Sequence, residues 1–365
     1  MMRIGIITFH RVINYGGVLQ AYALQQVLQK LCPSAEVEIV DYINIHFKRQ
    51  YAPISMAMFR HPRSLFMKLS LANYKRIRNK KFYEFVGKYM TLGRKGINKD
   101  KLKSECKKYD KLVTGSDQVW NLECTGNDFT YFLEIDCSAQ KYSYAASFAL
   151  ETLDPSYVAR IKRCLKNFRN ISVREDAGRK IVEDLLGIQV DIMPDPTLLL
   201  EVEEWKLLEK KLDGLPEKYN LIIQMGGDID RLQGHMKKIS QNLPVVYINL
   251  SQRPVKGMIN ICTASPEEWL YIINHAENIV TNSFHGCVFS ILFRKVFYYE
   301  LTKDKNSNSR IITLAKTLGL EECNVDLLYK NQIKPSIDYE IVELKIQELR
   351  QKAKKYLLEI IGEDK

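Results

Sequence analysis

Residues 281–286, TNSFHG, place hydroxyl, amide and imidazole side chains between two apolar segments. The pattern predicts a strand, a turn capped by Ser283, and a helix whose first turn contains His285 and Gly286. The positive end of a helix dipole attracts anions, and a histidine there can move a proton near neutral pH. We therefore expect Asn282, Ser283, His285 and Gly286 to bind an anionic donor. His285 is the candidate catalytic acid, and the alternative is a plain strand-to-helix turn.

Two arginines and one aspartate stand where further elements end or begin. Arg174 follows a predicted strand in "ISVRE", and its planar fork suits a carboxylate or phosphate. We expect it to bind the donor and to take part in catalysis; the alternative is a local ion pair with Glu175 or Asp176. Arg310, in "NSNSR", begins an amphipathic helix and could bind the same anion. Asp195 lies between two prolines, where we favour a turn cap over a role in orienting a base.

Two polar turns have the composition of a sugar-binding site. "GSDQVWN", residues 115–121, follows a predicted strand, and "NYGG", residues 14–17, precedes a predicted helix. Sugar hydroxyls need paired donors and acceptors, and the apolar face of a sugar stacks on indole. The alternatives are an Asx-type turn over a core Trp and a plain tight turn. The expected acceptor-binding residues are Asn14, Tyr15, Gly16, Gln20, Ser116, Asp117, Gln118, Trp120 and Asn121. Asp117 is also a candidate catalytic residue.

Apolar strand-like runs alternate with amphipathic helical stretches along the chain. This pattern predicts an α/β protein made of two Rossmann-like domains with mostly parallel sheets facing across a cleft, and sites at the carboxyl ends of strands. We expect an N-terminal domain at 1–200 with a basic helical insertion at 46–111, a C-terminal domain at 201–340, and a C-terminal helix at 341–365.

The charge of the chain is concentrated in one segment. Residues 46–111 hold 19 Lys and Arg against 4 Asp and Glu, whereas the rest of the chain holds 35 against 39. Aromatic and aliphatic side chains alternate with the basic ones, which suits an anionic membrane surface. The alternative is a solvated helical insertion packed on its own domain. No nucleic-acid motif accompanies the charge, so we expect no nucleic-acid partner.

Several classes of protein are disfavoured by composition. The 365 residues contain no apolar stretch long enough to cross a bilayer, and the first ten residues read as a strand and not as a signal peptide. The eight cysteines show no zinc or disulfide spacing. We therefore expect a cytoplasmic protein with no metal site.

The ordered motifs resemble the polysaccharide pyruvyl transferase family. The similar segments begin with "MRIGIITFHRVINYGGVLQAYALQQVL" and continue through "YDKLVTGSDQVWN", "KYSYAASFA", "ISVRE", "DPTLLL", "VTNSFHGCVFSILFRKVF" and "NSRI". The resemblance implies a fold similar to GT-B glycosyltransferases. It also implies transfer of pyruvate from phosphoenolpyruvate, as donor substrate and without a further cofactor, to a sugar of a cell-surface polysaccharide or its lipid-linked precursor. The N-terminal domain would be the acceptor side and the C-terminal domain the donor side.

One departure from the family and two other functions stay open. Many relatives carry an arginine a few residues after "LGL", where this chain has Glu-Glu-Cys-Asn at 321–324. The donor would then be bound differently, or by Arg310 alone. A GT-B glycosyltransferase that uses a nucleotide sugar, and a non-catalytic member of a polysaccharide-synthesis complex, are the alternatives.

Overall fold

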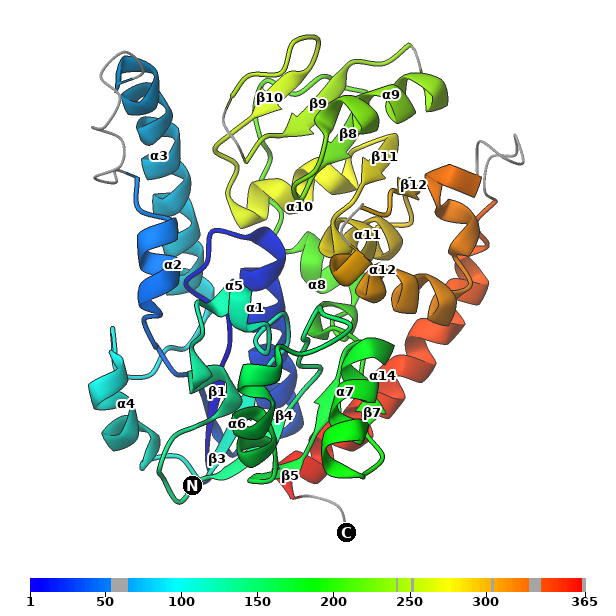
Figure 1. The fold of residues 1–365 in the computed structure, drawn as a ribbon. Coiled ribbons are helices and arrows are strands. Elements are labelled where there is room, and N and C mark those ends of the chain that lie inside the picture. Colours follow the sequence, from blue (N-terminus) through cyan, green and yellow to red (C-terminus); the bar gives the residue numbers. More distant parts are fainter. Residues whose placement is uncertain (54–64, 241, 251–252, 303–304, 328–335, 363–365) are drawn as a thin grey trace. The chain divides into compact units, whose positions relative to one another are not determined.

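The computed structural model describes residues 1–53, 65–240, 242–250, 253–302, 305–327 and 336–362, without the side chains of 65–70 and 305–307 (Figure 1). The chain divides into two compact units. Unit 1 comprises Met1–Gln50, Val86–Leu200 and Leu344–Lys365, and unit 2 comprises Tyr51–Phe85 and Glu201–Glu343.

Unit 1 is built on a five-stranded parallel sheet in the order β2-β1-β3-β4-β5. Its strands are β1 (Arg3–Ile7), β2 (Glu36–Ile39), β3 (Lys111–Thr114), β4 (Gln140–Ser143) and β5 (Phe168–Asn170). A separate parallel pair is formed by β6 (Ser172–Val173) and β7 (Asp191–Ile192). Because neighbouring strands run parallel, the loops that follow β1, β3 and β4 leave the sheet from the same edge.

The helical segments that lie in unit 1 connect these strands or close the unit. They are α1 (Tyr15–Leu31), α2 (Ile45–Gln50), α4 (Lys99–Cys106), α5 (Leu122–Thr125), α6 (Pro155–Leu165), α7 (Asp176–Leu186), and the short 3-10 turns η3 (Phe129–Phe132) and η4 (Pro196–Leu198). The last helix, α14 (Tyr339–Ile361), begins in unit 2 and is red in Figure 1.

Most of α14 is fixed to unit 1 by hydrogen bonds to backbone oxygens. Tyr356 donates from its hydroxyl to the carbonyl of Ser143 at 2.8 Å, at the end of β4. Arg350 donates to the carbonyls of Leu198 and Leu200, each at 2.8 Å. Lys111 Nζ donates to the carbonyl of Ile361 at 2.9 Å, which satisfies an acceptor that the end of a helix leaves open.

Unit 2 repeats the same construction with a five-stranded parallel sheet in the order β10-β9-β8-β11-β12. Its strands are β8 (Asn220–Ile223), β9 (Val245–Ile248), β10 (Ile259–Ile261), β11 (Asn278–Thr281) and β12 (Val296–Tyr299). Its helical segments are α8 (Val202–Lys206), α9 (Ile229–Ile239), α10 (Pro266–Asn274), α11 (Phe284–Leu292), α12 (Lys305–Leu318), η5 (Glu321–Cys323) and most of α3 (Leu65–Tyr89).

The expected α/β class with parallel sheets is confirmed, and two stretches belong to other units than we expected. Tyr51–Phe85, part of the basic insertion, lies in unit 2, and Leu344–Lys365 of the expected C-terminal helix completes unit 1. Part of that insertion, residues 54–64, lies outside the described residues. Among the helices of the described residues, none is both long and apolar enough to cross a membrane.

Two short strands escaped the sequence analysis because their own residues carry weak signals. β5 is Phe-Arg-Asn, and it follows closely after α6, which ends at Leu165. β10 has only three residues, Ile259–Ile261, with a polar residue in the middle. Both are edge strands of their sheets, so pairing with one neighbour and not local propensity determines them.

The aromatic core of unit 1 explains one residue of the "GSDQVWN" turn. The Trp120 side chain is fully buried, stacks on Phe132 with ring centroids 5.6 Å apart, and lies 5.1 Å from the Phe148 ring. Its Nε1 donates to the carbonyl of Tyr131 at 3.2 Å. The prediction that Trp120 stacks on a sugar is therefore wrong, because its ring has no exposed face.

Replacing Trp120 by Ala should lower the free energy of unfolding by about 3–5 kcal/mol, because it leaves a cavity among aromatic rings. Urea denaturation followed by circular dichroism measures the loss. Leu207→Ala is the control, since Leu207 is 86% exposed and should change stability by less than about 0.5 kcal/mol. Equal effects of the two changes would contradict the core position of Trp120.

Candidate functional site

The turn after β1 leads directly into α1 and is fixed by its own polar side chains. Asn14 caps α1 by accepting a hydrogen bond from Gly17 N at 3.1 Å. Gln20, one turn later and fully buried, donates to Thr8 Oγ1 at 2.8 Å and to the carbonyl of Gly17 at 2.9 Å. A Cβ atom built on Gly17 would lie 3.5 Å from Asp117 Oδ2, so the Asp117 carboxylate lies against the first turn of α1.

A cluster of charged side chains joins the loop after β1 to the loop after β2. His10 Nε2 lies 2.9 Å from Asp41 Oδ1, and His10 Nδ1 lies 3.2 Å from the carbonyl of Thr8. Arg11 donates from Nε and Nη2 to the two oxygens of Asp41, at 2.5 and 2.6 Å. Burial raises the pKa of Asp41, but His10 and Arg11 outweigh it and hold that pKa well below its usual value. Both ring nitrogens of His10 thus lie within hydrogen-bond distance of an oxygen.

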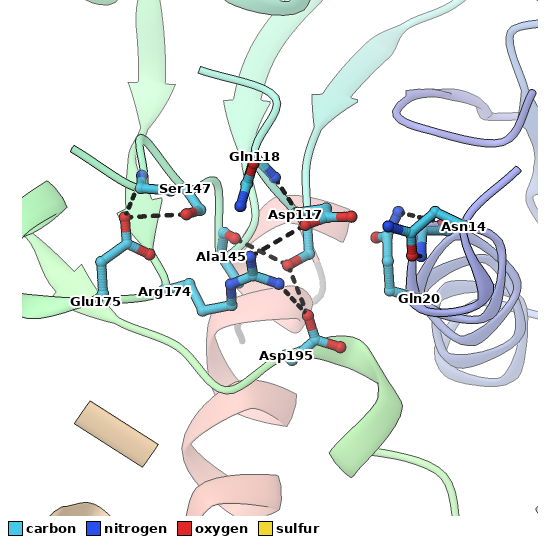
Figure 2. Close-up of polar contacts among 12 residues, drawn as sticks. Asn14, Gln20, Asp117, Gln118, Ala145, Ser147, Arg174, Glu175 and Asp195 are labelled. Carbon is cyan, nitrogen blue, oxygen red and sulfur yellow. Dashed lines mark hydrogen bonds and ion pairs between the residues drawn. The ribbon is translucent and has the colours of Figure 1, made fainter. Parts of the chain in front are cut away.

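The centre of the candidate site in unit 1 is a buried guanidinium between two carboxylates (Figure 2). Arg174 donates from Nη1 to Asp195 Oδ2 at 2.6 Å and from Nη2 to Asp117 Oδ1 at 3.1 Å. The exposed fractions of these side chains are only 2%, 0% and 10% for Arg174, Asp195 and Asp117. Burial lowers the pKa of Arg174, and the charges of Asp117, Asp195 and Glu175 raise it by more, so the net pKa lies above its usual value.

Asp195 caps a turn, as we favoured, and its second carboxylate oxygen pairs with Arg174. Its Oδ1 accepts from Thr197 N at 3.0 Å and from Thr197 Oγ1 at 2.7 Å, which caps the η4 turn as expected. Its Oδ2 binds Arg174, and Ser116 Oγ lies 3.1 Å from the same oxygen and 2.9 Å from the carbonyl of Ala145. A hydroxyl has one proton, so Ser116 divides it between these two acceptors.

Glu175 is a second buried acid next to Arg174. One oxygen, Oε1, accepts from Ser147 Oγ at 3.0 Å, from Phe148 N at 3.0 Å and from Ala149 N at 3.2 Å. Although Glu175 stands at the N-cap of α7, its side chain makes no cap hydrogen bond. Ser147 N in turn donates to the carbonyl of Asp117 at 2.9 Å, so Glu175 fixes the loop that supports Asp117.

The backbone around Asp117 adopts conformations that side chains usually avoid. Asp117, Ala145 and Ala149 have φ angles of 71°, 46° and 48°, in the left-handed region. Such residues cost about 1–3 kcal/mol each and persist where surrounding contacts determine them, commonly at functional sites. Gly115 has no alternative, because an added Cβ would lie 2.2 Å from the carbonyl oxygen of Tyr144. The loops after β3 and β4 are therefore packed backbone against backbone.

The expected acceptor-binding residues separate into supporting and central ones. Asn14 and Asn121 are helix caps, the latter accepting from Cys124 N at 3.0 Å. Ser116 and Gln20 have no exposed surface and have internal hydrogen bonds, so direct contact of either side chain with a sugar is contradicted. For Tyr15, Gly16, Asp117 and Gln118, direct contact with the acceptor stays a prediction. Gln118 N donates to Asp117 Oδ1 at 2.9 Å.

The candidate site in unit 2 is the start of α11, where the expected cap is confirmed. Ser283 Oγ accepts from Gly286 N at 3.2 Å, and Thr281 Oγ1 accepts from Ser283 N at 2.9 Å while donating to the carbonyl of Ile223 at 2.8 Å. A Cβ on Gly286 would lie 2.4 Å from Thr281 Oγ1, so this close approach requires glycine. The helix begins at Phe284, so its first turn contains His285 and Gly286 as expected.

Asn282 connects the ends of two neighbouring strands. Its Oδ1 accepts from Met225 N at 2.6 Å, and its Nδ2 donates to the carbonyl of Gly226 at 3.0 Å. Met225 and Gly226 lie in the loop between β8 and α9, which the sequence analysis did not single out. Asn282 thus fixes this loop beside the first turn of α11, and its predicted contact with the donor stays a prediction.

His285 and Arg310, two of the expected donor-binding residues of unit 2, both lie near the ring of Phe284. The His285 ring lies 5.1 Å from the Phe284 ring in an edge-on arrangement, and Arg310 Cζ lies 5.9 Å from the same ring. His285 is 6% exposed. Arg310 is the sixth residue of α12 and not its first, because the helix already begins at Lys305. The first turn of α11, an imidazole and a guanidinium form a positive region suited to an anion.

Three supporting residues were not predicted, although the sequence contained a signal for each. Glu175 was considered only as an alternative partner of Arg174, while Ser147 and Met225 were each predicted as the last residue of a strand. Polar or loop residues directly after parallel strands reach the same edge of a sheet, so position alone could have identified them.

Comparison with known proteins supplies the family. The sequence profile described as "Polysaccharide pyruvyl transferase" matches residues 14–299 of the chain. The chain belongs to the polysaccharide pyruvyl transferase family. The matched range contains both candidate sites except Arg310. No curated protein matches the chain.

Solved structures similar to this pyruvyl transferase family member have the GT-B fold. UDP-GlcNAc 2-epimerase from Methanocaldococcus jannaschii is 11% identical with a TM-score of 0.51, over 99% of this chain and 99% of that one. A putative UDP-N-acetylglucosamine 2-epimerase from Listeria monocytogenes is also 11% identical, with a TM-score of 0.50 over 96% of this chain and 90% of that one. These likenesses confirm the expected GT-B-like fold class.

Arg174→Met should lower the free energy of unfolding by about 3–5 kcal/mol, because it leaves two buried carboxylates without their counter-ion. Chemical denaturation measures this loss. The control is Arg179→Met, whose arginine is 45% exposed and pairs with Asp176 at the surface. A surface pair contributes at most about 1 kcal/mol, so similar losses in both variants would contradict the structural role of Arg174.

Proposed function

We propose that this protein transfers pyruvate from phosphoenolpyruvate to two hydroxyls of one sugar, forming a ketal on a cell-surface polysaccharide or its lipid-linked precursor. Membership of the polysaccharide pyruvyl transferase family carries this proposal, because the matching profile covers residues 14–299. The family makes the protein a transferase. The donor, the acceptor sugar and the residue roles below are our proposals.

The reaction requires one acid and acceptors for two hydroxyl protons. Protonation of the methylene carbon of phosphoenolpyruvate makes C2 electrophilic, and a sugar hydroxyl adds there and loses its proton. The C2–O bond to phosphate then breaks with its electrons on phosphate, and a second hydroxyl adds to C2 and loses its proton. The products are the ketal and inorganic phosphate. The protein must therefore neutralise a phosphate and a carboxylate and exchange protons.

We assign the donor contacts to the first turn of α11 and to Arg310, and the acid to His285. The helix start and the guanidinium provide positive charge, and both Arg310 and His285 lie within 6 Å of the Phe284 ring, at 5.9 and 5.1 Å. A histidine is the side chain whose ordinary pKa suits proton transfer near neutrality. A direct contact of Arg174 with the donor remains a prediction, and the two carboxylates on its guanidinium favour a supporting role.

We assign Asp117 as the group that accepts a proton from a sugar hydroxyl. Arg174 and Gln118 N both donate to Oδ1, and Oδ2 faces the first turn of α1. The ionised carboxylate, which only accepts hydrogen bonds, is the form that can take a proton. Asp117 Oδ1 and Oδ2 thus have different surroundings, one held by the protein and one directed towards the "NYGG" turn.

We place the reaction in the cytoplasm, where phosphoenolpyruvate is made, and at the inner surface of an anionic membrane where a lipid-linked acceptor would be present. A nucleotide sugar is the alternative donor, and nothing in the geometry of either unit favours it. Thermal-shift titration with phosphoenolpyruvate and with UDP- and CMP-sugars separates these donors. Stabilisation by a nucleotide sugar alone would overturn the proposed donor, and no response to any of them would favour a non-catalytic protein.

His285→Ala should slow phosphate release from phosphoenolpyruvate, in the presence of a sugar acceptor, by roughly 10²–10⁴-fold, since it removes the acid. The melting temperature should stay within a few degrees of the wild type. His275→Ala is the matched control, because His275 is exposed at the end of α10 and stacks on Tyr271. Full activity together with a much lower melting temperature in His285→Ala would make His285 a packing residue.

A further inference from the structure

The helix α3 has one buried side and one exposed side. The inward side includes Phe82 and Phe85, each 1% exposed, and Asn79, whose Nδ2 donates to the carbonyl of Tyr51 at 2.8 Å. The outward side includes three large apolar side chains, Tyr74, Ile77 and Tyr83, which are 43%, 40% and 45% exposed. Exposed aromatic and aliphatic side chains gathered on one helix face are a recognised sign of an interaction surface.

The basic residues of α3 divide between these two sides. Arg78 is 6% exposed and donates to the carbonyl of Leu250 at 3.2 Å, and Lys81 donates to Glu268 Oε2 at 2.7 Å. These two cations therefore stabilise unit 2. Arg76 and Lys80 are exposed, and Lys80 makes only a loose surface pair with Glu84 at 3.7 Å.

Helical spacing places the exposed cations among the exposed apolar side chains. Residues three and four positions apart are neighbours on a helix, so Ile77 and Tyr83 both adjoin Lys80, and Tyr74 adjoins Ile77. Arg76 adjoins Lys80 in the same way. Glu84, which is exposed and pairs with Lys80, lies on the same side. We call Tyr74, Arg76, Ile77, Lys80, Tyr83 and Glu84 the outer face of α3.

We propose that the outer face of α3 binds the surface of an anionic lipid bilayer. Charge complementarity supports this occupant, because Arg76 and Lys80 outnumber the single acid of the face, Glu84, and no other Asp or Glu occurs between residues 46 and 84. Aromatic side chains sit well at the boundary between head groups and acyl chains, while Lys and Arg attract anionic head groups. Binding of the outer face to a bilayer does not depend on the proposed function. Only the purpose of this binding, which is to bring the enzyme to a lipid-linked acceptor, rests on the proposed function.

Sedimentation with liposomes tests the proposal on the full-length protein. We expect binding to vesicles of phosphatidylcholine mixed with phosphatidylglycerol at low salt, weaker binding at high salt, and none to phosphatidylcholine alone. Arg76→Glu combined with Lys80→Glu should weaken binding to the anionic vesicles by at least about tenfold. The control with the same change in charge is Lys237→Glu combined with Lys316→Glu, at exposed positions of α9 and α12.

The apolar contribution is tested separately with Ile77→Asp, for which Ile188→Asp is the control at a position 47% exposed in unit 1. Only Ile77→Asp should reduce vesicle binding. Equal binding by each variant and its control, equal binding to neutral vesicles, or no binding at low salt would overturn the proposal. Calorimetric titration of every variant with phosphoenolpyruvate separates failure of membrane binding from failure of the proposed function. Variants of the outer face should bind the donor as the wild type does.

Discussion

The buried charge of Arg174 is the interaction on which the candidate site of unit 1 depends. Its guanidinium pairs with Asp117 and Asp195, and the charge of Glu175 also raises the pKa of Arg174. Buried anions are tolerated only where hydrogen bonds replace the lost water. Each acid accordingly accepts donors from a loop: Gln118 N for Asp117, Thr197 N for Asp195, and Phe148 N with Ala149 N for Glu175.

This requirement makes the loops after four strands interdependent. β3, β4, β6 and β7 each supply one part of the network, and none of these strands is longer than four residues. The side chains thus hold together elements that have few ladder hydrogen bonds of their own. Asp117, Ala145 and Ala149 keep left-handed backbone angles at the same place, where the network offsets their cost.

The sequence predicted the elements of both sheets better than the roles of the polar residues between them. Strands such as β3 and β11 were predicted with the bounds that they have, because a buried parallel strand reads as an apolar run. The turn at Ser283 was also correctly predicted, since a cap depends on near neighbours in the chain. These signals are local.

Burial of a polar turn is not a local property, and there the sequence analysis failed. The composition of "GSDQVWN" suits a sugar site and equally suits an internal network, because both pair donors with acceptors. Only the tertiary structure shows that Trp120 meets Phe132 and that Ser116 meets Asp195. The same applies to Arg174, whose partners Asp117 and Asp195 are distant in sequence, whereas we considered only adjacent acids.

The order of segments along the chain has a consequence for synthesis on the ribosome. Unit 1 takes its last piece, Leu344–Lys365, from beyond the whole of Glu201–Glu343, which belongs to unit 2. While unit 2 is being made, the carbonyls of Ser143, Leu198 and Leu200 still lack the donors that α14 will bring. These carbonyls of unit 1 can therefore receive α14 only after translation has passed through the second unit.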